Sequence, residues 1–225
     1  ALLFTGPRGT GKTSTARILA KSLKCPQAQD FVPCNSCATC REISTGVSVD
    51  IIEIDGASNN SVDNIRELRD NIGYMPSQGK YKVYIIDEVH MLSTSAFNAL
   101  LKTIEEPPAH VVFIFATTEV NKIPQTILSR CQRFDFRRLS TRQIQERLEQ
   151  ICKSEAIRFD SQALWLIARQ GDGSMRDSQT LLDQVFNFSQ GQLTAEEVAR
   201  ILGLTDRQLL NDALQALVSQ NSTAT

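Results

Sequence analysis

The sequence is distinguished first by what it lacks: a long apolar run, an internal repeat, a low-complexity tract and an excess of one charge sign. No apolar stretch approaches the roughly 18 residues that a membrane-spanning helix needs. Lys and Arg number 24 against 25 Asp and Glu, whereas a protein that binds a phosphate backbone usually carries a clear basic excess. We therefore expect a cytoplasmic protein with no membrane partner, in which any contact with nucleic acid is local or shared between subunits.

The chain does contain enough apolar sequence to build proper cores. Of its 225 residues, 41% are hydrophobic and 22% are charged, which suits one large or two modest globular domains. The sequence begins at Ala1 within a predicted strand and ends on the polar stretch 221–225. We interpret it as a fragment of a longer protein.

A glycine-rich segment, GPRGTGKT, follows the apolar run Ala1 to Thr5 and precedes a predicted helix at 12–24. Its spacing fits the phosphate-binding loop, in which backbone N–H groups and the positive end of the next helix face a phosphate chain. In this motif Lys12 reaches the β and γ phosphates and the Thr13 hydroxyl binds Mg²⁺. The alternative is a flexible turn that matches by accident. We expect nucleotide contacts from Gly6, Pro7, Arg8, Gly9, Thr10, Gly11, Lys12, Thr13 and Ser14.

Apolar strand patterns alternate with helical patterns as far as about residue 138. Strands are predicted at 49–55, 82–87 and 111–116, and helices at 62–72 and 93–105. Strands that are apolar almost throughout suit a parallel sheet covered on both faces. The predicted fold class is α/β, a doubly wound parallel sheet of the P-loop type that binds ligands beyond the carboxyl ends of its strands.

The pattern changes after Ser140, where capping boxes and helical spacing replace strands. Ser140, Ser174 and Thr194 each stand three residues before Gln, Asp or Glu, which is the signature of a helix start. We predict a separate, small all-α domain at 140–204, with Trp165 as an ordinary core aromatic.

A carboxylate pair, Asp87-Glu88, ends the predicted strand at 82–87. Asp87 in this place is suited to hold Mg²⁺ through water, and Glu88 to polarise the water that attacks the γ phosphate. Strands often end in surface carboxylates, so the pair alone is weak evidence. Its weight comes from its combination with the phosphate-loop motif.

Four cysteines, at 25, 34, 37 and 40, stand in a C-x8-C-x2-C-x2-C arrangement. Four thiolates from one short loop predict a closed, structural Zn²⁺ site with the ligands Cys25, Cys34, Cys37 and Cys40. Disulfides are the main alternative, and Fe–S ligation is a lesser one. His90 and His110 have no ligand partners at metal spacing, and we expect structural or surface roles for both.

Several stretches together resemble the AAA+ ATPases of sliding-clamp loaders, and most closely the tau/gamma family of bacterial DNA polymerase III. They are VYIIDEVHML at 83–92, NALLKTIEEPP at 98–108, FATT at 115–118 and ILSRC at 127–131. The resemblance implies an ATPase domain at 1–139 with a zinc-binding insertion at about 25–46, a helical lid at 140–204, and the start of a truncated helical collar domain at 205–225.

The resemblance also implies residue roles. Thr118 matches the sensor after the fourth strand, Arg176 matches the second sensor in the lid, and Arg130 matches the arginine finger that reaches a neighbouring subunit's site. Together with Lys12, Asp87 and Glu88, Thr118 and Arg130 form the expected catalytic set. A surface arginine and a helix-start arginine are the plain alternatives for Arg130 and Arg176.

The family uses ATP and Mg²⁺ within a hetero-pentamer of clamp-loader subunits that loads the sliding clamp onto primer-template DNA. The resemblance therefore implies the same cofactors and partners here. Helix starts offer phosphate contacts without base reading, and the candidates for DNA contact are Asn59, Asn60, Ser61 and Lys102, although helix caps also explain the first three. Two other functions are a nucleotide-gated scaffold that barely hydrolyses ATP and, less favoured, a phosphotransferase.

Overall fold

The computed structural model describes residues 1–59, 62–189, 192–204 and 215. The chain divides into two compact units, Ala1–Arg138 and Leu139–Thr225, and each is considered by itself. None of the helices in the described part of the chain combines the length and the apolar character needed to span a bilayer.

The first unit is built on a five-stranded sheet in which every strand pairs in parallel with its neighbours. In spatial order the strands are β2 (Ile51–Asp55), β3 (Lys82–Asp87), β4 (Val111–Thr117), β1 (Leu2–Thr5) and β5 (Gln132–Asp135). The pairs Asp55 with Asp87 and Thr5 with Thr117 are in register. The carboxyl ends of the strands therefore align along one edge of the sheet.

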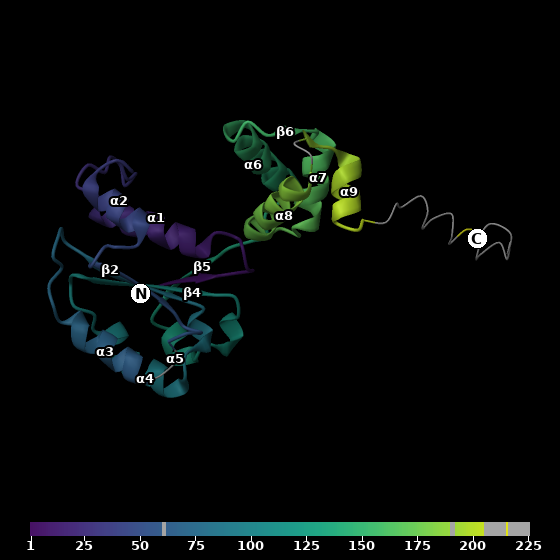
Figure 1. Ribbon diagram of the computed structural model, residues 1–225. Coiled ribbons are helices and arrows are strands. Elements are labelled where there is room, and N and C mark those ends of the chain that lie inside the picture. Colours follow the sequence, from purple (N-terminus) through teal and green to yellow (C-terminus); the bar gives the residue numbers. More distant parts are fainter. Residues whose placement is uncertain (60–61, 190–191, 205–214, 216–225) are drawn as a thin grey trace. The chain divides into compact units, whose positions relative to one another are not determined.

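Helices cover both faces of this sheet (Figure 1). One face carries α1 (Lys12–Lys24) and α2 (Ala38–Thr45), and the other carries α3 (Val62–Ile72), α4 (Thr94–Glu105) and α5 (Gln125–Leu128). Short 3-10 helices, η1 (Val89–Met91) and η2 (Val120–Lys122), follow β3 and β4. The predicted doubly wound α/β fold is confirmed.

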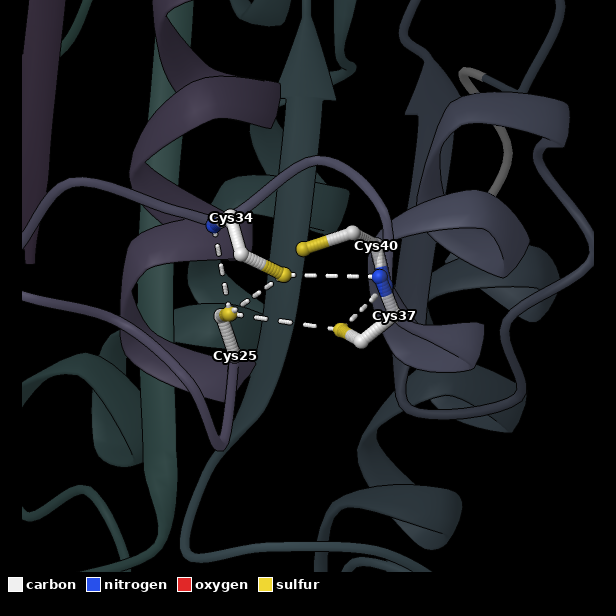
Figure 2. A group of neighbouring side chains, drawn as sticks. All are labelled: Cys25, Cys34, Cys37 and Cys40. Carbon is white, nitrogen blue, oxygen red and sulfur yellow. Dashed lines mark hydrogen bonds between the residues drawn. The ribbon is translucent and has the colours of Figure 1, made fainter.

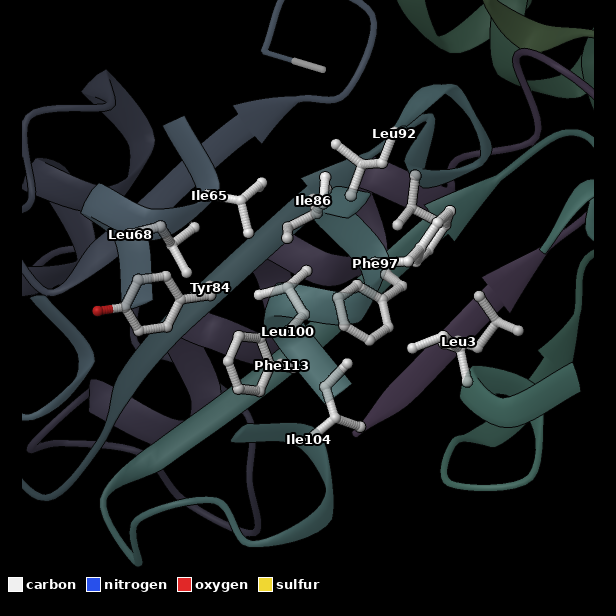
Figure 3. Close-up of a cluster of buried hydrophobic side chains, with 14 of the residues drawn as sticks. Leu3, Ile65, Leu68, Tyr84, Ile86, Leu92, Phe97, Leu100, Ile104 and Phe113 are labelled. Carbon is white, nitrogen blue, oxygen red and sulfur yellow. The ribbon is translucent and has the colours of Figure 1, made fainter. Parts of the chain in front are cut away.

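Alternate side chains of the central strands enter two separate cores. Tyr84 and Ile86 of β3 point into the cluster under α3 and α4, which Figure 3 shows, whereas Val83 and Ile85 point into the cluster under α1. Both sets are fully or almost fully buried. Burial on both faces explains why β3 and β4 are apolar nearly throughout rather than alternating.

The second unit is a helical bundle with its own core. Its helices are α6 (Thr141–Ser154), α7 (Ser161–Gln170), α8 (Met175–Phe188) and α9 (Ala195–Ile201). Ser140, Ser174 and Thr194 cap α6, α8 and α9 as predicted, each accepting a backbone N–H three residues on. The apolar stripe of α6, formed by Ile144 and Leu148, is fully buried.

This unit is helical as predicted, but one small element was missed and one expectation was wrong. A small parallel pair joins β6 (Arg158–Phe159) to β7 (Gln192–Leu193), where no strand was predicted; two-residue strands are too short to show an alternating pattern. Trp165 is 41% exposed rather than in the core. Its ring lies under the Arg169 guanidinium, 5.4 Å from the centroid, one turn further along α7. The segment predicted as a collar, 205–225, lies outside the described residues apart from position 215.

Candidate functional site

The glycine-rich loop joins β1 to α1 at the carboxyl edge of the sheet. Gly6 has a φ of 143°, and a Cβ there would lie 2.2 Å from the Phe136 carbonyl oxygen. Gly11, directly before α1, has a φ of 93°. Both positions require glycine, because a side chain would clash or adopt a strained left-handed backbone. The glycines thus let the chain turn sharply between the end of β1 and the start of α1.

The Lys12 side chain folds back into this loop. Its ammonium donates hydrogen bonds to the carbonyl oxygens of Gly6 (2.8 Å) and Pro7 (2.9 Å). Burial lowers the Lys12 pKa, and the charges of Glu88 and Asp87 partly oppose that change. The loop itself therefore holds this ammonium beside the backbone that would surround a phosphate chain.

Thr13 and Asp87 meet across the site from different elements. The hydroxyl of Thr13, in the first turn of α1, donates to Oδ2 of Asp87, the last residue of β3, at 2.6 Å. The other Asp87 oxygen, Oδ1, accepts the Glu88 backbone N–H at 2.9 Å. A hydroxyl and a carboxylate side by side are the hard oxygen ligands that Mg²⁺ prefers, so the residues present fit this ion.

Glu88 occupies an unusual backbone conformation and is tied to the next strand. Its φ is 43°, in the left-handed region that non-glycine residues rarely adopt. Its carboxylate Oε2 accepts the Thr118 hydroxyl at 2.9 Å and the Thr118 backbone N–H at 3.2 Å. Lys12, Thr13, Asp87, Glu88 and Thr118 are therefore linked at one edge of the sheet, as the sequence-based expectation requires.

The remaining loop residues frame the site. The Thr10 hydroxyl donates to the Pro7 carbonyl oxygen at 2.8 Å, which tightens the loop. Arg8 and Ser14 are exposed. Their side chains are therefore accessible to solvent.

The contacts of Arg130 and Arg176, the two arginines predicted to act in hydrolysis, do not include the residues around Lys12 and Asp87. Arg130 is exposed, pairs with Glu105, and donates to the Thr126 carbonyl oxygen at 2.7 Å. Arg176 is exposed in the first turn of α8, in the second unit. The structure of each unit by itself does not bring either arginine to the loop.

The residues predicted to contact DNA differ in their surroundings. Asn59 is used locally, since its side-chain amide donates to the Asp55 carbonyl oxygen at 3.2 Å. Lys102 is exposed on α4. Asn60 and Ser61 lie outside the described residues.

The four predicted metal ligands converge between the end of α1 and the first turn of α2, which contains Cys40 (Figure 2). All four Sγ atoms lie within 4.8 Å of one another. Cys25 Sγ is 3.5 Å from Cys34 Sγ and 4.0 Å from Cys37 Sγ. A tetrahedral ion with bonds of about 2.3 Å sets its sulfurs about 3.8 Å apart, whereas a disulfide bond is about 2.05 Å long. The spacing fits a metal site and not a disulfide, and all six cysteines of the chain are free thiols in the structure.

The local backbone gives the cysteines different proton affinities. Backbone N–H groups of Ser36 and Cys37 lower the pKa of the Cys34 thiol to about 6. Burial raises the pKa of Cys40 to about 12. Because a metal ligand must be a thiolate, binding at Cys40 has to displace a proton.

Two features of the site were not predicted. The ring of His90 is buried beside Glu88, with side-chain exposure of 5%, although the sequence indicated only a structural or surface histidine. Its place two residues after Glu88 is the one signal that could have suggested this. Next to the cysteine cluster, the buried Lys24 ammonium pairs with Asp50. Only the fold brings these two residues together.

The strand order, the glycine-rich loop after β1 and the acidic pair at the end of β3 define a P-loop AAA+ fold. Residues 1–140 match the family model described as "DNA polymerase III, delta subunit", and residues 143–191 match "DNA polymerase III clamp loader subunit, ATPase lid domain". The chain belongs to this family of DNA polymerase III clamp-loader subunits.

Relatives and solved structures agree with this assignment. The chain is 51% identical over 221 residues to DNA polymerase III subunit tau of Bacillus subtilis, covering 98% of this chain and 39% of that protein. It is 48% identical to the Escherichia coli subunit tau, covering 98% and 34%. The Thermotoga maritima RuvB Holliday junction branch migration motor shares the fold, with a TM-score of 0.64 and 16% identity over 90% of this chain and 61% of that one. The chain thus spans well under half the length of these tau subunits.

Proposed function

We propose that this chain is the ATP-hydrolysing part of a DNA polymerase III clamp-loader subunit, which uses ATP binding and hydrolysis to load the sliding clamp onto primed DNA. The observation that carries the proposal is the link between Thr13 of α1 and Asp87 of β3, directly beside the Lys12 ammonium. A nucleotide-binding scaffold without hydrolysis has no chemical need for Glu88 and Thr118 in addition. Their contact beside this link favours an ATPase over a scaffold.

Binding of ATP and Mg²⁺ is assigned to the glycine-rich loop with Lys12, and to Thr13 and Asp87. Lys12 would exchange its bonds to the Gly6 and Pro7 carbonyl oxygens for β and γ phosphate oxygens. Thr13 would bind Mg²⁺ directly and Asp87 would hold it through water. The ion would neutralise charge on the phosphates as the terminal phosphoryl group leaves.

Hydrolysis is assigned to Glu88 and Thr118. Water attacks the γ phosphorus, the bond from that phosphorus to the bridging oxygen breaks, and ADP and phosphate result. Glu88 orients this water and accepts its proton as the new bond forms. The Thr118 hydroxyl, which donates to Glu88, would hold the water or a γ oxygen when nucleotide is bound.

Two arginines would complete the site, one through assembly with a neighbouring subunit and one through movement of the lid. Arg130 would enter the site of a neighbouring subunit, where a guanidinium stabilises the transferring phosphoryl group and is worth about 10³ to 10⁵ in rate. Arg176 would report bound triphosphate to the lid. Hydrolysis would then depend on the assembled oligomer of clamp-loader subunits.

The cysteine cluster is assigned to one structural Zn²⁺, held by Cys25, Cys34, Cys37 and Cys40. Four thiolate ligands leave no open position on the ion, so this metal would stabilise the loop and take no part in hydrolysis. For DNA, Lys102 remains the described candidate with an exposed cationic side chain, and a contact there would be to phosphate rather than to bases.

The proposal is tested with the full-length protein. ATP hydrolysis is measured for the protein alone, then with the other clamp-loader subunits, and then with clamp and primer-template DNA. We expect strong stimulation only when all are present. Hydrolysis that stays at the level of the isolated protein would support the nucleotide-gated scaffold instead.

A further inference from the structure

The buried histidine beside the acidic pair makes contacts that no role assigned above explains. His90 belongs to η1, which begins directly after Glu88. Its Nδ1 forms a hydrogen bond of 3.0 Å with the Thr117 hydroxyl and lies 3.3 Å from Glu88 Oε2. On the opposite side of the ring, Nε2 lies 3.4 Å from Glu119 Oε1. Both ring nitrogens therefore face polar groups although the side chain is only 5% exposed.

The contacts of Glu88 are concentrated on one of its two oxygens. Oε2 accepts both bonds from Thr118 and also lies next to His90 Nδ1. In the described part of the chain, none of these contacts involves Oε1. Oε1 is therefore the oxygen placed to accept a proton from water.

The backbone conformation of Glu88 requires contacts that keep this residue in place. Its left-handed conformation, with φ at 43°, is strained for a residue other than glycine and persists only where the surroundings fix it. The Asp87 carboxylate fixes the Glu88 N–H from one side. The ring of His90 stands against its side chain from the other.

The hydrogen on the ring decides whether His90 attracts Glu88. When Nδ1 carries it, the ring presents an N–H toward Glu88 Oε2 and the Thr117 hydroxyl oxygen. When only Nε2 carries it, the ring donates to Glu119 and turns a lone pair toward Glu88, which repels the carboxylate. We take the first arrangement, because the Thr117 hydroxyl oxygen and Glu88 Oε2, which lie 3.0 Å and 3.3 Å from Nδ1, can both accept its hydrogen.

A second chain of contacts links this ring to the phosphate loop. The Thr117 hydroxyl oxygen accepts the Glu119 backbone N–H at 3.0 Å, which fixes it beside the ring. The Thr117 carbonyl oxygen accepts the Gly6 backbone N–H at 3.2 Å. The residue that orients His90 is thereby bonded to the first glycine of the loop.

From this geometry we propose that His90 is a positioning residue for Glu88. Its Nδ1–H, oriented by Thr117, holds Glu88 Oε2 so that Oε1 faces the attacking water. The inference rests on the proposed function, since it concerns the same hydrolysis step. His90 does not itself touch the nucleotide in this scheme, so its loss should affect turnover and leave nucleotide binding unchanged.

Three substitutions separate positioning from packing. His90→Phe keeps the ring and removes both nitrogens. His90→Asn places an amide near the position of Nδ1, and His90→Gln places one near Nε2. In the full-length protein assembled with the other clamp-loader subunits, clamp and primed DNA, we expect His90→Phe and His90→Gln to lower kcat by about 10- to 100-fold, the range for a displaced catalytic group. His90→Asn should recover most of the wild-type kcat.

Binding measurements and a stability control complete the test. KM for ATP and the Kd of a nonhydrolysable analogue should change by less than about twofold in all three variants, because only the transition state is affected. Thermal unfolding identifies any variant that fails to fold. A kcat for His90→Phe near that of the wild type, or equal losses in His90→Asn and His90→Gln, would overturn the proposal.

The wild-type protein and Lys12→Ala distinguish this failure from failure of the proposed function. If the wild type hydrolyses ATP and Lys12→Ala does not, the histidine variants report on positioning alone. If the assembled wild type is inactive, or is matched by Lys12→Ala, the proposed function fails. The role of His90 then fails with it, because an unused base needs no positioning.

Discussion

The guanidinium of Arg130 is paired with the carboxylate of Glu105, with Nη2 and Oε1 2.7 Å apart. Arg130 follows α5 and Glu105 is the last residue of α4, so the pair joins two helices on the same face of the sheet. A further bond to the Thr126 carbonyl oxygen holds the same guanidinium. The proposed arginine finger is therefore occupied within its own subunit and must exchange partners to reach a neighbour.

Removing this competing partner should favour the proposed finger. The two side chains are 37% and 44% exposed, and exposed pairs contribute at most about 1 kcal/mol. We expect Glu105→Gln to raise kcat in the assembled complex by no more than about fivefold. Glu106→Gln, at the next position, is the control and should have no effect. A clear fall in kcat for Glu105→Gln would mean that the pair supports the active arrangement.

Arg130→Ala should affect hydrolysis and spare binding. Loss of a guanidinium supplied to the neighbouring site should cut turnover by about 10³-fold or more, measured with all subunits, clamp and primed DNA. Binding of a nonhydrolysable analogue should match the wild type. Arg133→Ala, which removes a nearby exposed arginine paired with Asp135, is the matched control. Unchanged turnover in Arg130→Ala would remove the finger assignment.

Lys12→Ala should abolish tight binding of ATP. The ammonium is the one strong positive charge that the loop holds in place, through the Gly6 and Pro7 carbonyl oxygens. Titration with a labelled nonhydrolysable analogue measures the effect, and Lys21→Ala on the same helix controls for charge and helix stability. Retained affinity in Lys12→Ala would reject the phosphate-loop assignment.

The buried pair of Lys24 and Asp50 predicts a pH dependence of stability. Burial favours a raised Asp50 pKa, but hydrogen bonds from Lys24, Ser77 and Gln78 outweigh it and lower the pKa from 3.8 to about 2. The ionised Asp50 carboxylate therefore contributes its full share to the free energy of unfolding above about pH 4. This contribution, roughly 2 kcal/mol, is lost as the pH falls toward 2.

Denaturant unfolding of wild type and Asp50→Asn checks this dependence. At pH 7 the variant should be less stable by about 3–5 kcal/mol, since it leaves a buried ammonium without its carboxylate. The gap should narrow between pH 4 and pH 2. Asp30→Asn changes an exposed carboxylate of the same unit and should leave the curve unchanged. A constant gap across the acid range would contradict the Asp50 assignment.

Elemental analysis tests the cysteine cluster. We expect one Zn²⁺ per chain in the wild type and none in Cys34→Ser, because three thiolates and a hydroxyl form a much weaker site. Cys152→Ser changes a buried cysteine of the second unit and should keep the metal. Wild-type protein that is purified without chelator and contains no metal would end the assignment.

The sequence predicted what depends on local spacing. The phosphate loop, the acidic pair and the four cysteines each lie within a short segment, and the structure brings their members together. Strand β5 was missed because Gln132–Asp135 is an exposed edge strand and has no apolar pattern. Trp165 was misplaced because helical periodicity does not show that Arg169 would cover an exposed ring. The contacts of His90 with Thr117 and Glu119 join different strand ends, and no sequence pattern indicates them.

Helix α1 begins at the phosphate loop and ends where Cys25, the first cysteine of the cluster, caps it. Its 13 residues span about 20 Å at 1.5 Å each. One helix therefore has the proposed anion-binding end and an end that carries a cysteine of the cluster. Contacts that hold the Cys25 end of α1 in place also help to set the direction of its Lys12 end. Loosening the cysteine cluster would thus tilt α1 and misalign the backbone N–H groups at its first turn. None of the residues proposed to contact ATP would need to change.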